Sequence, residues 1–140
     1  MAEFTNVALQ TVGIGQNVVF NETPICGGSN IYHREGSGVV RLRSVTQQCR
    51  ARYKISFGGN VQIPTGGTVE GISLAIALDS EPLGSATMIV TPAAVEDFWN
   101  VFAAVYVEIP RGCCATVAVE NTSTQPIEVQ NANLIIERVA

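Results

Sequence analysis

The sequence is short of charged residues. Only 14% of its 140 residues are Asp, Glu, Lys or Arg, against about 25% in an average soluble domain, while 46% are hydrophobic. A chain with so little charge cannot cover its whole exterior with polar side chains, and large exposed apolar areas normally mark interaction surfaces. The composition therefore predicts that part of the surface packs against other copies of the chain.

Three further features that are missing restrict the location and the partners. No run approaches the roughly 20 apolar residues of a membrane-spanning helix. Residues 1–10 lack the basic start and the apolar stretch of a secretory signal. The net charge of -4 provides no broad basic surface for a phosphate backbone. We therefore expect neither membrane insertion nor a nucleic-acid partner.

The sequence contains one histidine, His33, and no recognisable nucleophile motif. A Ser-His-Asp or Cys-His arrangement would have to combine His33 with a Ser or Cys of a glycine-rich loop, and the spacing indicates none. Cys26, His33 and Cys49 are suitable zinc ligands, but they lack a short Cys-x-x-Cys spacing. The adjacent Glu96 and Asp97 could bind calcium, but they match no EF-hand loop. We expect no enzymatic activity, no cofactor and no metal.

The four cysteines leave the redox state open. Cys26 and Cys49 bracket a long loop and could form a disulfide if their Cα atoms approach within about 7 Å. A chain of this length can build a core without disulfides, so free thiols fit as well. Cys113 and Cys114 are adjacent, and successive side chains of a strand point to opposite faces. At least one of the two is therefore expected to be a small buried hydrophobic residue.

Hydrophobic residues alternate with polar ones along most of the chain, which is typical of half-buried strands. In residues 51–57, for example, Tyr53, Ile55 and Phe57 share one face, whereas Arg52 and Lys54 lie on the other. Glycine- and proline-containing turns separate such segments, including the turn expected at residues 58–60. Ten strands are expected, at residues 5–11, 16–21, 39–43, 51–57, 60–63, 69–78, 86–91, 99–109, 115–120 and 128–139. We predict an all-β antiparallel jelly-roll sandwich of ten strands, forming a single domain over residues 1–140.

The segment 98–110 is hydrophobic on both faces. One face carries Trp99 and Val101 and stays apolar as far as Ile109, while the other carries Phe102 and Tyr106. A strand with a wet outer face should alternate between apolar and polar residues. Either a loop of the same chain covers the second face, or Phe102 and Tyr106 contact other subunits. The low overall charge favours the second interpretation.

Three segments, ISLAIALDSEPLG (72–84), VEIPRGCCATVAVEN (107–121) and NANLIIERV (131–139), resemble the C-terminal jelly-roll domain of bacterial and phage collagen-like proteins. Its fold is shared with the tumour necrosis factor and complement globular-head superfamily. The resemblance runs from Phe4 onward and implies a tight trimer with apolar and aromatic residues around the threefold axis. The last strand is then central and beside the axis. Phe102, Tyr106, Leu134 and Ile136 are the residues expected at that interface.

The resemblance implies a structural role rather than a chemical one. Because no Gly-X-Y stalk is present, we expect a homotrimer displayed on a phage particle, as a capsid-surface or fibre component, or on a bacterial exterior, where other virion or surface proteins could contact it. The alternative is a receptor- or glycan-binding module. For that role the candidate residues are Tyr32, His33, Arg34 and Trp99, which lie in or next to expected loops.

Overall fold

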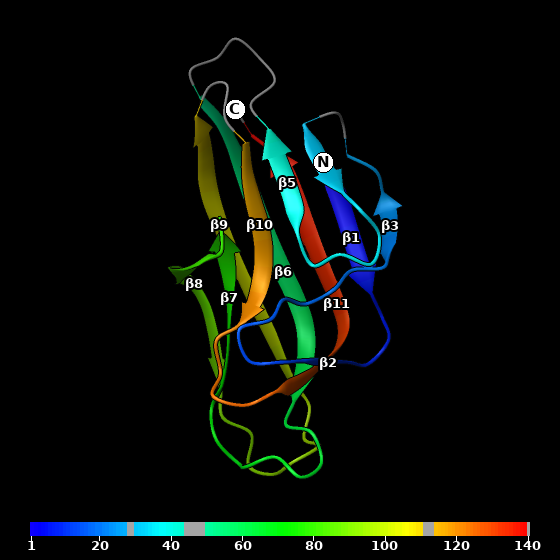
Figure 1. Ribbon diagram of the computed structural model, residues 1–140, viewed down its shortest axis with the longest axis vertical. Coiled ribbons are helices and arrows are strands. Elements are labelled where there is room, and N and C mark those ends of the chain that lie inside the picture. Colours follow the sequence, from blue (N-terminus) through cyan, green and yellow to red (C-terminus); the bar gives the residue numbers. More distant parts are fainter. Residues whose placement is uncertain (28–29, 44–49, 111–113, 140) are drawn as a thin grey trace.

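A computed structural model describes residues 1–27, 30–43, 50–110 and 114–139, which form two antiparallel sheets packed face to face (Figure 1). The strands are β1 (Ala2–Asn6), β2 (Gln10–Val12), β3 (Glu22–Ile25), β4 (Ile31–His33), β5 (Val40–Arg43), β6 (Arg50–Gln62), β7 (Ile72–Leu78), β8 (Glu81–Val90), β9 (Trp99–Pro110), β10 (Cys114–Asn121) and β11 (Ile127–Arg138). Among these residues no helix is long and apolar enough to cross a membrane.

Each sheet follows a path of five strands. Sheet A has the order β3-β1-β11-β6-β9, with the short β2 added beside β11, and sheet B has the order β4-β5-β10-β7-β8. Every pairing is antiparallel. The last strand, β11, is the middle strand of its path, as the resemblance implied. The two edge strands of sheet A are therefore β3 and β9, on opposite sides of the sandwich (Figure 1).

The core lies between the sheets and follows the alternation seen in the sequence. On β6, Tyr53, Ile55 and Phe57 are fully buried, and on β9 the side chains of Val101, Val107 and Ile109 are buried as well. The Tyr53 hydroxyl accepts a hydrogen bond from the Asn30 amide at 2.9 Å and donates one to the Arg43 carbonyl at 2.8 Å. Burial raises the pKa of Tyr53, although the Asn30 hydrogen bond and the charge of Arg138 oppose the shift.

A bulge in β11 changes which residues face the core. Asn131 has a φ of 56°, and the pairing of β11 with β6 shifts between Gln130 and Asn133. Before the bulge the buried side chains are at odd-numbered positions, and after it they are at even-numbered positions. Leu134 and Ile136 therefore point into the core of the chain itself.

The prediction of a turn at residues 58–60 is wrong, because β6 continues through Gly58 and Gly59. The glycines serve close packing rather than chain reversal. A Cβ at Gly58 would lie 3.0 Å from Oδ1 of Asn133 and 3.8 Å from the ring of Phe102. The two strands expected at residues 51–57 and 60–63 are thus one long strand.

The N-terminal third departs most from the expectation. Residues 16–21 form two isolated bridges, Asn17 with Glu120 and Phe20 with Ser37, instead of a strand. The short strands β3 and β4 were not predicted, because β3 contains a proline and is mostly exposed, and therefore shows no alternation. The turn expected after Leu78 is present, but it needs only Asp79 and Ser80, both with positive φ as in a two-residue hairpin.

Candidate functional site

The outer face of sheet A carries two large aromatic side chains in water. Phe102 and Tyr106 project from β9 with 66% and 62% of their surface exposed, and the small Ala104 stands between them. Their partners across β6 are Gly58 and Lys54. Two rings on one edge strand, next to small residues, form a flat apolar surface that the described chain leaves uncovered.

A row of amides borders this apolar area. Asn100 donates a hydrogen bond to Asn60 at 3.2 Å, and Asn60 donates one to Asn131 at 3.3 Å, so the row crosses β9, β6 and β11. On the other side of the rings, Arg52 and Glu108 form an ion pair at 2.9 Å. The outer face of sheet A thus has an apolar middle between an amide row and an ion pair.

Two of the four residues predicted at the trimer interface do not belong to this surface. Leu134 and Ile136 have no exposed surface at all and fill the core beneath sheet A. The prediction is wrong for these two side chains, because the bulge at Asn131 turns them inward. The hydrophobic residue that β11 presents outward is Ile135, which is partly buried. Phe102 and Tyr106 do lie on the outside.

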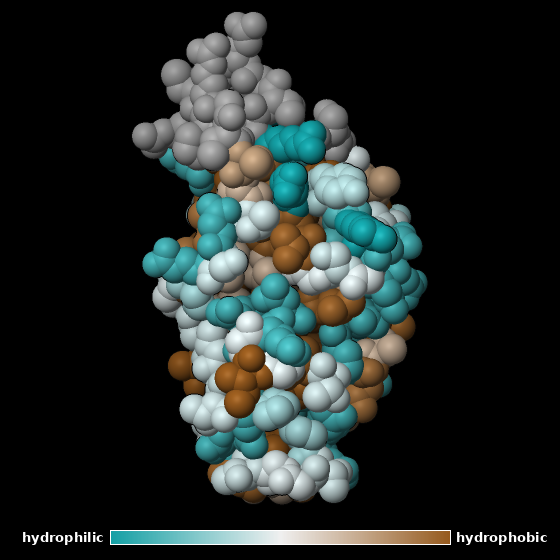
Figure 2. All heavy atoms as spheres, viewed as in Figure 1, coloured by the Kyte–Doolittle hydropathy of each residue, from teal (hydrophilic) through white to brown (hydrophobic). Residues whose placement is uncertain are grey.

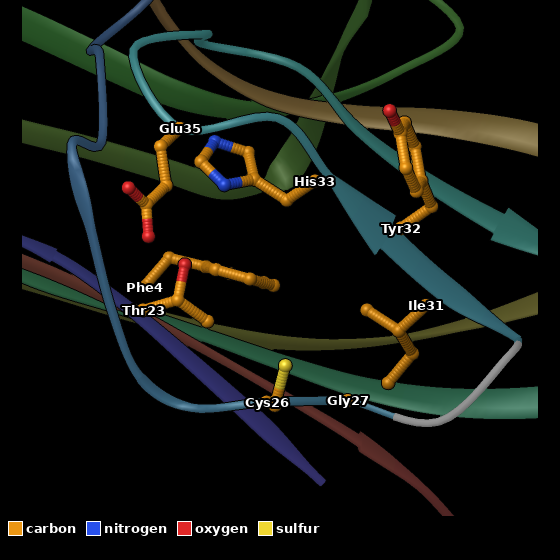
Figure 3. A pocket seen from close by; sticks show the side chains of 8 residues that line it. All are labelled: Phe4, Thr23, Cys26, Gly27, Ile31, Tyr32, His33 and Glu35. Carbon is orange, nitrogen blue, oxygen red and sulfur yellow. The ribbon is translucent and has the colours of Figure 1, made fainter.

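A pocket of about 480 Å³ opens on the opposite edge of the sandwich, where β3 and β4 lie (Figure 3). Its lining combines aromatic rings with a thiol, a hydroxyl, an imidazole and a carboxylate. The lining residues are Phe4, Thr23, Cys26, Gly27, Ile31, Tyr32, His33 and Glu35. They come from β1, from β3 and the segment that follows it, and from β4 with the turn after it.

Aromatic contacts and one hydrogen bond fix the imidazole of His33 in the pocket wall. The ring centroid lies 4.6 Å from that of Phe4 and 6.4 Å from that of Phe20. Nε2 is 2.8 Å from the carbonyl oxygen of Ser37. Since a carbonyl oxygen can only accept, Nε2 carries the proton in this contact. Nδ1 is buried and has no hydrogen-bond partner among the described residues.

The structure brings together only some of the residues predicted for ligand binding. Tyr32 and His33 line the pocket, and Arg34 lines a neighbouring hollow with Glu35, Gly36 and Ser37. Trp99 starts β9 at the lower end in Figure 1, whereas β5, the strand that pairs with β4, ends at the upper end. One ligand site therefore does not contain both Tyr32 and Trp99.

The predicted disulfide partners are not both described. Cys26 is exposed, and its sulfur points into the pocket in Figure 3, but Cys49 lies outside the described residues. The same holds for the zinc set that included Cys49. Within the described ranges no three His, Cys, Asp or Glu side chains are grouped so as to hold a metal ion.

Sequence reasoning missed three of the polar and aromatic pocket residues, namely Phe4, Thr23 and Glu35. They lie on three separate segments that pack together only in the folded chain. No local motif links them, and β3 itself was not predicted. Tyr32 and His33 are the lining residues that the sequence singled out for ligand binding, and His33 stood out as the sole histidine of the chain.

No family model matches the sequence, and no curated protein matches it either. Solved structures match it by fold. The globular domain of zebrafish complement 1qA protein aligns with a TM-score of 0.64 at 12% identity, covering 96% of this chain and 94% of that one. Murine APRIL, in a crystal structure at pH 5.0, aligns with a TM-score of 0.59 at 9% identity, covering 95% of each chain. The chain therefore has the predicted jelly-roll fold of the tumour necrosis factor and complement globular-head type.

Proposed function

We propose that this chain is a non-enzymatic structural module that assembles as a homotrimer through the outer face of sheet A. Its setting is the exterior of a phage particle, as a capsid-surface or fibre component, or the exterior of a bacterium, where other surface proteins can contact it. Each subunit contributes rigidity and a displayed surface, and no chemical step is involved.

The exposure of Phe102 and Tyr106 carries this proposal. Two aromatic residues on one strand, each more than 60% exposed, are costly for an isolated chain. Covering the exposed part of one such ring, roughly 100 to 150 Å², contributes about 3 kcal/mol per subunit. Burying two rings in each of three subunits therefore favours assembly against the entropic cost of bringing the chains together.

The surroundings of the rings also support a second copy as the occupant. Gly58, Ser56 and Ala104 keep the middle of the face flat, so the backbone of a neighbour can approach closely. The amide row from Asn100 to Asn131 offers both donors and acceptors, and a symmetry-related row can complement it. Polar groups around apolar side chains are the usual anatomy of an interface, and here the amide row and the Arg52–Glu108 ion pair border the rings, with Lys54 beside Tyr106.

A matched pair of variants tests the proposal. Phe102→Glu places a charge on the outer face of sheet A, and Ile89→Glu makes the same kind of change at an equally exposed position, 68%, on sheet B. Light scattering should show that Phe102→Glu reduces the trimer to single chains and that Ile89→Glu leaves it intact. Trimers in both variants, or single chains in both, would contradict the proposal.

The second candidate function is a receptor- or glycan-binding module, and the pocket lined by Tyr32 and His33 favours it. Concave sites with apolar walls and a few polar groups are the usual places for small ligands. If this role is right, Tyr32→Ala abolishes binding on a glycan array, whereas Trp99→Ala at the other end of the sandwich does not. Equal losses in both variants would exclude the pocket as the binding site.

A further inference from the structure

Three polar groups around the pocket make no hydrogen bond with the described residues. They are Nδ1 of His33, the carboxylate of Glu35 and the hydroxyl of Thr23. His33 and Glu35 come from β4 and the turn after it, whereas Thr23 comes from β3, and Figure 3 shows the three side chains near the ring of Phe4. Of the three groups only Nδ1 is buried, and a buried polar atom without a partner is uncommon in folded proteins and calls for an explanation.

All three groups can accept a hydrogen bond. When Nε2 donates to the carbonyl of Ser37, Nδ1 is the ring nitrogen that can accept a hydrogen bond. The carboxylate of Glu35 only accepts, and the hydroxyl of Thr23 can accept. The part of the pocket between them therefore offers acceptors from three directions, together with one negative charge.

We propose that the pocket binds a primary ammonium group, carried either by a small amine or by a lysine side chain. An ammonium group has three donors and no acceptor, which matches the three acceptors. Its positive charge pairs with Glu35, and hydrogen bonds between charged groups are the stronger ones. The apolar stem of the amine lies against the side chains of Ile31 and Tyr32.

The pocket has to adapt to such a ligand. Nδ1 of His33 is closed to water and the ring of Phe4 packs against the imidazole, so an ammonium group reaches Nδ1 only after a neighbouring side chain moves. Glu35 is exposed and no contact with the described residues holds its side chain, so its carboxylate can turn toward the bound ammonium group. An alcohol has one donor and no charge, a quaternary ammonium has the charge without donors, and a carboxylate ligand is repelled by Glu35. These differences make the proposed ligand class testable.

The first experiment compares three probes of similar shape by NMR titration of the full chain. The probes are n-butylamine, n-butanol and butyltrimethylammonium. We expect n-butylamine to bind about tenfold more tightly than the other two, with shifts centred on residues 31–35. Equal binding of butanol, or no binding of the amine, overturns the proposal. Nα-acetyl-lysine amide separates the two sources, because tighter binding than n-butylamine indicates a lysine side chain.

The second experiment uses variants that keep shape and change one group. Glu35→Gln removes the charge, and His33→Gln places an amide nitrogen near the position of Nε2 while deleting the acceptor at Nδ1. Each should weaken n-butylamine about tenfold, whereas Glu81→Gln, the same change on the far edge of sheet B, should not. Unchanged binding in Glu35→Gln, which is exposed and safe for folding, overturns the proposal. The proposed ammonium site rests only on the binding role of the pocket. The trimer is tested separately, by light scattering, so one proposal can fail without the other.

Discussion

The outer faces of the two sheets differ in the large hydrophobic side chains that they expose, although both have small residues at their centre. On sheet B the outward residues Ala77 and Ala118 are almost fully buried, and Ile89 is the only large hydrophobic side chain of β7, β8 or β10 that is mostly exposed. Figure 2, which views the molecule from that side, shows hydrophobic side chains scattered among hydrophilic ones. On sheet A the corresponding area holds Phe102 and Tyr106 side by side on one strand.

Several polar groups at the ends of β7 and β10 in sheet B pair within the chain. The carboxylate of Asp79 accepts a hydrogen bond from the backbone N–H of Thr116 at 2.9 Å, and the hydroxyls of Ser73 and Thr122 are 2.6 Å apart. Sheet A instead leaves two rings in water. Sheet B exposes Tyr32 and Ile89 on two separate strands, whereas sheet A exposes two rings on one strand, and the trimer contact is proposed there for that reason.

The largest effect on the free energy of unfolding is expected when an inward and an outward residue of β11 are compared. Leu134→Ala removes a fully buried side chain and should lower the free energy of unfolding by about 2 to 5 kcal/mol, because it leaves a cavity between the sheets. Ile135→Ala, one residue along and facing outward, should cost less than half as much. Urea unfolding at a fixed chain concentration measures both. An unfolding curve of Leu134→Ala equal to that of the native chain would place Leu134 outside the core.

The next largest loss of stability is expected from Asn121, which lies at the end of β10 in sheet B. The amide of Asn121 donates to the carbonyls of Val12, Gly13 and Gln125 and accepts from the N–H of Ser123, and the residue is fully buried. Asn121→Ala should therefore cost about 2 to 4 kcal/mol of unfolding free energy. Thermal unfolding measures the loss, and the exposed Asn21→Ala is the control. Similar stabilities of the two variants would show that the Asn121 network does not hold the loops.

Much of the fold follows from alternation alone. Alternation predicted the inward residues of β6 and β9 and the exposure of Phe102 and Tyr106. It failed at Gly58, because glycine marks either a turn or a close approach, and only the neighbouring Asn133 and Phe102 decide between them. The assignment of Leu134 to the trimer interface came from the resemblance, and it failed because the bulge at Asn131 turns this side chain inward.

The pocket could be predicted only in part. A lone histidine near a tyrosine drew attention to Tyr32 and His33, which do line it. Phe4 and Thr23 entered the site through long-range packing of β1 and β3 against β4, which no local pattern encodes. Trp99 was grouped with Tyr32 because both lie in or next to expected loops, but strand direction puts them at opposite ends of the sandwich.

A smaller loss of stability is expected on replacing Tyr53, whose hydroxyl connects β6 of sheet A to the Arg43 carbonyl of β5 in sheet B. Since burial raises its pKa, the folded state disfavours the phenolate. Stability should therefore be constant below the ordinary tyrosine pKa of about 10 and decline as the pH rises through the raised value. Tyr53→Phe should lose about 1 to 2 kcal/mol at neutral pH, from the hydrogen bonds to Asn30 and Arg43, and show a weaker alkaline decline. Unfolding curves from pH 8 to 11 test this, and identical declines would contradict it.

The smallest effect lies in the β7–β8 hairpin at the edge of sheet B. Ser80 has a φ of 69°, which is unfavourable for residues with a Cβ. Ser80→Gly should raise the free energy of unfolding by about 0.5 to 1 kcal/mol. Thermal unfolding measures the gain, with Ser85→Gly, an exposed position within β8, expected to be destabilising instead. A loss of stability in both variants would contradict the strained turn.

The most direct test of the difference between the two faces is the mass of the native protein in solution. Sedimentation equilibrium over a range of micromolar concentrations should give three times the 14.9 kDa of one chain, and unfolding should coincide with dissociation. A stable folded species of 14.9 kDa at those concentrations would show that the exposed rings of sheet A need no partner, and would contradict the account.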